Sequence, residues 1–163
     1  MTFQTESPSG PVYPNERNEV ISMKDATPIP QGQYVPATRF ENIIFTAGMT
    51  PRDNGVLIRS GKIAVSDPID DYRDCVRQAA KNALTAARSK LEEGERIERI
   101  LLLTVYVNAE EGYTTQAKIA DHASAYFCEE LGEGGIGSRA AVGVASLPGN
   151  APVEIAIVAA AGK

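Results

Sequence analysis

The stretch Ser138 to Ala161, SRAAVGVASLPGNAPVEIAIVAAA, decides the fold of this chain. It is typical of two strands rich in valine, isoleucine and alanine, separated by a turn at residues 148–152. Only two charged side chains interrupt it, Arg139 near its start and Glu154 just after the turn. A buried charge is costly without a partner or a ligand, so this apolar segment is predicted to carry a functional site.

Arg139 is either held in an internal ion pair or free to bind a ligand. Its guanidinium matches a carboxylate with two parallel hydrogen bonds, and the small residues Ala140 and Ala141 leave room beside it. Glu154 is the obvious internal partner. If the two strands pair as a hairpin, however, Glu154 lies opposite Ser146, more than about 20 Å from Arg139 at roughly 3.3 Å per residue. The two groups then meet only if the strands do not pair, or if a neighbouring subunit supplies one of them.

The rest of the chain predicts one domain over residues 20–163, preceded by a flexible arm over residues 1–19 that is rich in proline and polar residues. The predicted elements are a short strand at 20–21, a buried strand at 42–50, a turn at 52–55, a helix from 67 to about 94, a strand at 100–107 and a helix at 110–131. The strand at 100–107 is expected at the centre of the sheet, covered on both faces. This order indicates an α+β fold or a mixed α/β sheet, with both helices layered on one face of the sheet, and we predict the α+β class.

The first helix is predicted to open at Asp67-Pro68, where Asp67 can cap and proline suits the first helical position. Apolar residues then recur at helical spacing, and alanine dominates the middle of the stripe. The stripe consists of Ile69, Tyr72, Val76, Ala79, Ala80, Ala83, Leu84, Ala87 and Leu91. Such a helix is expected to lie close against a sheet.

Composition limits the possible functions. The net charge of −5 argues against nucleic acid and anionic membranes as partners. Cys75 and Cys128 lie far apart in the two predicted helices, which favours reduced, buried thiols in a cytosolic protein. No apolar run is long enough to span a membrane, and the N-terminal residues do not resemble a signal peptide. We therefore expect a cytoplasmic protein.

Two weak motifs are best explained without chemistry. GEGGIG at residues 132–137 fits the dinucleotide fingerprint only formally, because it follows a helix and precedes a strand. We interpret it as a flexible link, with the further hypothesis that it forms a lid over a ligand of Arg139. His122 is the single histidine and is expected to be an ordinary helix residue. One histidine and two distant cysteines do not make a metal site, so neither metal nor cofactor is predicted.

Four segments together resemble the reactive intermediate deaminase family, also called the Rid or YjgF family. The likeness runs from about Pro28 to Ala159, and its last motif is closest to a subgroup of longer members with undefined activity. Gly32-Gln-Tyr34 is similar to the Gly-Pro-Tyr of the family, and residues 45–51 (FTAGMTP) to its Ser-Gly-Gln-x-Pro strand. Residues 138–148 resemble the signature Arg-x-x-Val-x-Val-x-x-Leu-Pro, followed at the right distance by Val153-Glu154-Ile155.

The resemblance implies a chorismate-mutase-like fold, assembled as a homotrimer with three clefts between subunits. It also implies a hydrolytic deaminase that acts on small reactive 2-enamino or 2-imino acids. Arg139 would clamp the carboxylate of this metabolite and Glu154 would position water, while Tyr34 and the Gly48 backbone would line the cleft. An imine is already electrophilic, so binding, orientation and a positioned water suffice without a cofactor.

Two positions depart from the family pattern. Ala47 stands where deaminating members have serine, and Ala141 where they often have cysteine. Loss of the serine hydroxyl removes a donor from the cleft, so the substrate or the rate is expected to differ, and substrates larger than 2-aminoacrylate remain open. The first alternative is a non-catalytic trimer that binds small carboxylates as a sensor or carrier. The second is an endoribonuclease, against which the acidic net charge counts.

Overall fold

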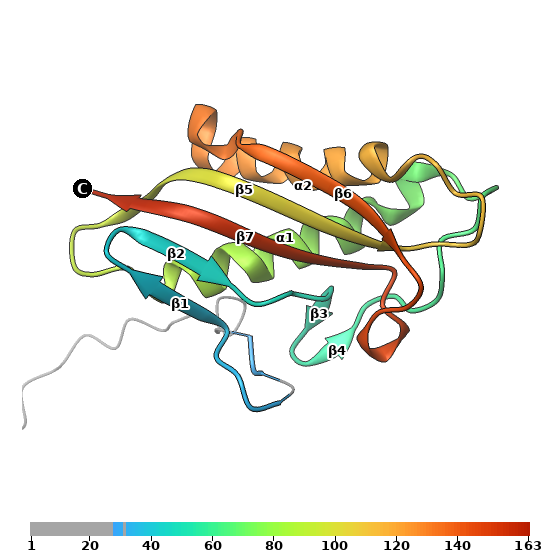
Figure 1. Cartoon of the computed structure of the whole chain (residues 1–163), viewed down its shortest axis with the longest axis horizontal. Coiled ribbons are helices and arrows are strands. Elements are labelled where there is room, and N and C mark those ends of the chain that lie inside the picture. Colours follow the sequence, from blue (N-terminus) through green and yellow to red (C-terminus); the bar gives the residue numbers. More distant parts are fainter. Residues whose placement is uncertain (1–27, 31) are drawn as a thin grey trace, which may run out of the picture.

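The fold is a sheet of five strands covered on one face by two helices, shown in a computed structural model that describes residues 28–30 and 32–163 (Figure 1). The strand order is β1-β2-β7-β5-β6. The strands are β1 Ala37–Phe40, β2 Ile43–Thr46, β5 Arg96–Asn108, β6 Ser138–Val144 and β7 Val153–Gly162. The helices are α1 Arg73–Arg88 and α2 Gln116–Leu131. The predicted α+β class is confirmed, whereas the predicted arm and the strand at 20–21 lie outside the described residues.

The two strands of the deciding stretch do not pair with each other. β6 runs parallel to β5, with Leu103 opposite Arg139, and β7 runs antiparallel to the other edge of β5. A parallel neighbour needs a crossover, and α2 supplies it between β5 and β6. The chain must then cross the end of β5 to begin β7 on its far side. The hairpin expected from the turn at 148–152 is therefore wrong, because β5 lies between its two strands.

β7, not β5, is the middle strand of the sheet, and β5 is covered on one face only. Leu101 and Leu102 are 37% and 39% exposed, although the run they belong to was expected to be covered on both faces. Leu102 is exposed because both helices lie on the other side of the sheet (Figure 1), whereas Leu101 lies at an irregularity in the pairing of β5 with β7. β7 shows the resulting pattern most simply, since buried and partly exposed residues alternate along all of it.

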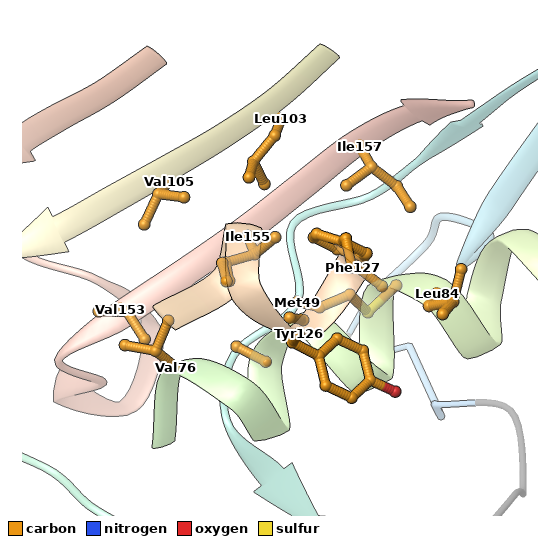
Figure 2. Packing of buried hydrophobic residues seen from close by; sticks show 14 of the residues in the cluster. Met49, Val76, Leu84, Leu103, Val105, Tyr126, Phe127, Val153, Ile155 and Ile157 are labelled. Atoms are coloured by element: carbon orange, nitrogen blue, oxygen red, sulfur yellow. The ribbon is translucent and has the colours of Figure 1, made fainter. Parts of the chain in front are cut away.

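The core lies between the helices and the inner face of β5 and β7. Leu103, Val105, Ile155 and Ile157 point from the sheet toward the helices, where Phe127 of α2 meets them (Figure 2). The predicted alanine stripe of α1 is fully buried in its middle, which confirms its packing. Alanine side chains let the helix backbone approach the sheet closely, so a larger residue there would overpack the core.

Both helices begin later than predicted. Asp67 does not cap a helix, because its Oδ2 accepts hydrogen bonds from the Ala64 backbone N–H and the Tyr72 hydroxyl, at 2.9 and 2.5 Å. A short 3₁₀ turn, Ile69–Tyr72, precedes α1 instead. The segment before α2 pairs with the Ile63 region, where the Glu110 N–H donates to the Ile63 carbonyl over 2.9 Å, and then forms a turn in which the Tyr113 N–H donates to the Glu110 carbonyl over 3.2 Å.

Two glycine-containing turns were predicted, with different outcomes. The turn at 52–55 is confirmed, because it joins β3 (Arg52–Asp53) to β4 (Val56–Leu57) with φ of +48° and +82° at residues 54 and 55. The segment 132–137 is not a flexible link but begins with a packed 3₁₀ turn. A Cβ atom on Gly134 or Gly135 would collide with the backbone of β5 or α2. These glycines allow close packing, so nothing supports a lid here.

Both cysteines are free, and they lie in the two helices as predicted. Cys75 is buried and Cys128 is exposed, which corrects the expectation that both are buried. Burial raises the pKa of the Cys75 thiol to about 11, so this group stays protonated at neutral pH. Within residues 28–30 and 32–163, no helix has the length and apolar character that crossing a bilayer requires.

Candidate functional site

Glu154 is a half-buried carboxylate on the open face of the sheet. Its neighbours Val153 and Ile155 point into the core, so the alternation of β7 places Glu154 on the face that no helix covers. Burial raises the pKa of its carboxyl group above the usual value. No hydrogen bond or ion pair joins it to any other residue in the described part of the chain. An acid in this state is suited to exchanging a proton with water or a ligand.

Ala47 and Gly48 lie beside Glu154, where the pairing of β2 with β7 is interrupted between Phe45 and Met49. The Ile157 N–H donates to the Thr46 hydroxyl over 3.0 Å, and pairing with β7 resumes at Met49, which exchanges two backbone hydrogen bonds with Ile155. The carboxyl group of Glu154 lies so close to the Gly48 Cα that a Cβ atom would overlap with it. The structure thus brings together three of the predicted site residues, Ala47, Gly48 and Glu154.

Tyr34 belongs to the segment that precedes β1. This segment contacts residue 47, because the Ala47 N–H donates to the Pro36 carbonyl over 2.9 Å. Tyr34 itself is 48% exposed, and its N–H donates to the Gly32 carbonyl. Its predicted place in the lining of the site stays a prediction.

Arg139 lies on the other face of the sheet, at its β6 edge. Its guanidinium contacts α2 through Nη1, which donates to Asp121 over 2.8 Å and to Ser124 over 2.9 Å. Nη2 donates to the Ala117 carbonyl over 3.3 Å. Ala141, two residues further along β6, is on the same face and packs against the core. Arg139 is therefore paired within its own chain, and its partner is Asp121, not Glu154.

One chain does not bring Arg139 and Glu154 together. The register places Arg139 three residues from the row of Glu154 and two strands away, which corresponds to roughly 14 Å between Cα atoms. The estimate of more than 20 Å rested on the hairpin and is too large. The conclusion that a single subunit cannot join them nevertheless holds, because their side chains leave opposite faces of the sheet.

Sequence reasoning missed Asp121 and Ser124. Asp121 and Ser124 lie three residues apart on α2, one turn after Ala117, and this spacing puts all three residues on one side of the helix. The spacing could have indicated from the sequence that these residues share one contact surface. Asp121 was noted only as the neighbour of His122, whose Nε2 instead lies 3.7 Å from Asp70. His122 is a partly buried helix residue, as predicted.

A cavity of about 360 Å³ lies at the other end of β6, where Gly143 and Gln116 line it. The ammonium of Lys62 also borders it and donates to the Asn108 side chain and to the carbonyls of Ala109 and Ala145. These bonds tie the ends of β5 and β6 together, so the lysine has a structural role. In the described part of the chain, no cluster of histidine, cysteine and acidic residues is suited to a metal ion.

Comparison with known proteins places these features in a family. The sequence profile of a family described as Endoribonuclease L-PSP matches residues 24–161. Protein TCP17 of Trypanosoma cruzi is 28% identical over 127 residues, which cover 74% of this chain and 79% of that protein.

Two solved structures show the same fold. One is the protein Atu1372 from Agrobacterium tumefaciens, of unknown function, with a TM-score of 0.74, 29% identity and coverage of 83% of this chain and 87% of that one. The other is TdcF of E. coli with bound serine, with a TM-score of 0.61, 21% identity and coverage of 85% and 94%. At this lower identity, the likeness to TdcF concerns the fold.

Proposed function

Because the chain belongs to the endoribonuclease L-PSP family, also known as the YjgF or Rid family, we propose that it hydrolyses small reactive 2-enamino and 2-imino acids. The observation that carries this proposal is the Glu154 carboxyl group, which is half-buried, has a raised pKa and lies against the Gly48 backbone. The substrate is a small carboxylate-bearing metabolite. Serine, which TdcF holds in its structure, is a molecule of this class.

The complete site is proposed to lie between two subunits of a homotrimer, with Arg139 from one copy and Glu154 from the next. The open face of the sheet supports this assembly, because it is apolar and carries no helix. One row across three strands contains Phe45, Val158 and Leu102, and Phe40 at the edge of this face is 73% exposed. Apolar surface of this extent is typical of a face that another protein chain covers.

The chemistry follows from the two charged groups. Arg139 binds the substrate carboxylate and so orients the C=N bond toward Glu154. The carboxylate of Glu154 takes a proton from water as the water oxygen attacks the imine carbon, and then gives that proton to the nitrogen. When this carbinolamine collapses, Glu154 takes the hydroxyl proton and passes it to the departing nitrogen. The C–N bond breaks, ammonia and a 2-oxo acid are released, and the carboxylate of Glu154 is regenerated.

The test is ammonia release from freshly generated imino acids, with and without the protein. We expect acceleration by the wild type and its loss in both Arg139→Ala and Glu154→Gln. Glu130→Gln is the matched control, because Glu130 is an acidic residue of α2 that pairs with Arg88, away from Arg139. Rates equal to the uncatalysed reaction for the wild type, or equal rates for wild type and variants, would exclude the proposal.

The second candidate is a non-catalytic binder of small carboxylates. Ala47 and Ala141 favour it, since both lack the functional groups of deaminating relatives while Arg139 is retained. Calorimetric binding of a 2-oxo acid without turnover of any imine would select this function. Cleavage of RNA by the purified protein would instead favour the endoribonuclease, against which the net charge of −5 counts.

A further inference from the structure

The contacts around Arg139 assign a role to two residues of α2. We infer that Asp121 and Ser124 are positioning residues, which hold the Arg139 guanidinium ready for the carboxylate of a ligand. This inference rests on the proposed function, because it concerns the same arginine. It goes beyond that function in naming side chains that touch neither the substrate nor the reacting atoms.

The geometry shows that only part of the guanidinium is engaged. Arginine has five N–H donors, and the three hydrogen bonds of Arg139 come from Nη1 and Nη2. Within the described residues, the Nε–H and one Nη2–H of Arg139 have no acceptor. A carboxylate bound in the bidentate manner takes two such donors, so a ligand and Asp121 can be bound at the same time.

The Arg139 side chain also needs neighbouring residues that restrict its conformation before a ligand binds. β6 is an edge strand of the sheet, so among the described residues no further strand covers the outer side of Arg139. A long side chain in this place loses rotamer freedom when it binds a ligand, and that loss weakens binding. Asp121 and Ser124 remove the freedom beforehand, because they fix Nη1 from two sides at 2.8 and 2.9 Å.

The opposite reading is that Asp121 competes with the ligand for Arg139. The two readings predict changes of opposite sign. If Asp121 positions the arginine, its removal weakens ligand binding. If Asp121 competes, its removal frees the arginine and strengthens binding. The remaining N–H donors of Arg139, on Nε and Nη2, favour the positioning role for Asp121, because a ligand can bind them without displacing Asp121.

The experiment measures binding of pyruvate, as a 2-oxo acid probe, by calorimetry, together with KM and kcat for imine hydrolysis. The variants of the full chain are Asp121→Ala, Asp121→Asn, which keeps an oxygen acceptor, and Ser124→Ala. We expect Asp121→Ala to weaken pyruvate binding about three- to tenfold, the range that corresponds to ordering one long side chain. KM should rise by a similar factor while kcat stays near the wild-type value.

The conservative variant and the control separate positioning from a general structural effect. Asp121→Asn should bind pyruvate more tightly than Asp121→Ala, because its side-chain oxygen still accepts from Nη1. Glu130→Gln, on the same helix, should bind as the wild type does. Asp121 is 65% exposed, so its variants should fold, which thermal unfolding will check.

Unchanged or tighter pyruvate binding by Asp121→Ala would overturn the inference and leave the proposed function intact. A lower kcat at constant KM would also overturn it. If the wild type neither binds pyruvate nor hydrolyses imines, the proposed function is wrong and this inference falls with it. The two failures are therefore distinguishable in one set of measurements.

Discussion

Gly48 and Glu154 are in direct contact, with the carboxyl group of the glutamate in the space that a Cβ atom on residue 48 would occupy. Gly48→Ala should therefore displace the carboxyl group. Because the group is the free end of a flexible side chain, the loss of stability should be small, about 1 kcal/mol. Ammonia release should fall much more strongly than stability.

A double-mutant cycle checks the cause of this effect. In Glu154→Ala the obstructing side chain is absent, so Gly48→Ala should cost almost no stability in that background when urea unfolding is measured. An equal cost in both backgrounds would show that the strain arises in the backbone at residue 48 instead.

Glu154 should make stability depend on pH in a defined direction. Its pKa is raised in the folded state, from a reference value of 4.5, so folding favours the protonated form. The stability that this preference contributes is present below the reference value and is lost as pH rises through the raised pKa. Glu154→Gln should be more stable than the wild type at pH 7, and this difference should shrink toward pH 4. Thermal unfolding across this range measures it, and a difference that grows on acidification would contradict the prediction.

Gly135→Ala should be strongly destabilising. A Cβ atom on residue 135 would collide with the Phe127 carbonyl, which belongs to the rigid backbone of α2. We expect a loss of about 3 kcal/mol or failure to fold, as for other overpacked positions. Chemical denaturation provides the measurement. A variant as stable as the wild type would show that the segment 132–137 is the flexible link expected from the sequence.

A mixture of two inactive variants should regain activity if the site lies between subunits. Arg139→Ala keeps an intact Glu154, and Glu154→Gln keeps an intact Arg139. When the two proteins are unfolded together and refolded, some clefts combine both intact residues. Ammonia release should reappear in the mixture, and each variant refolded alone is the control. A mixture as inactive as its parts would contradict a site shared between subunits.

The fold class and the two helices could be predicted because their signals are local. The alanine stripe of α1 repeats at helical spacing, and the alternating residues of β7 repeat at strand spacing, so each pattern indicates its element. The pairing of β6 with β5 was not predictable in this way. A turn sequence between two apolar strands is compatible both with a hairpin and with a crossing over an intervening strand, and only tertiary packing decides between them.

For the candidate site too, residues with a local sequence signal could be predicted, whereas contacts that form only in the folded chain could not. Glu154 was recognisable because a lone carboxylate in an apolar strand is conspicuous, and Gly48 because its motif resembles a known one. The partnership of Arg139 with Asp121 was not recognisable, since it joins an edge strand to a helix across 18 residues. The predicted start of the first helix was wrong for a related reason, because it depended on a contact that forms only in the folded chain. Asp67 has the properties of a cap, but in the folded chain its oxygen binds the Tyr72 hydroxyl.

The alternation of β7 has a consequence for the accuracy of folding. A slip of one residue against its neighbours would turn Glu154 inward among isoleucine side chains and push Val153 and Ile155 into water. The shifted register is strongly destabilised, because an ionised carboxylate buried among apolar side chains is very unfavourable. Glu154 therefore favours the native register of β7, independently of any reaction in which it takes part.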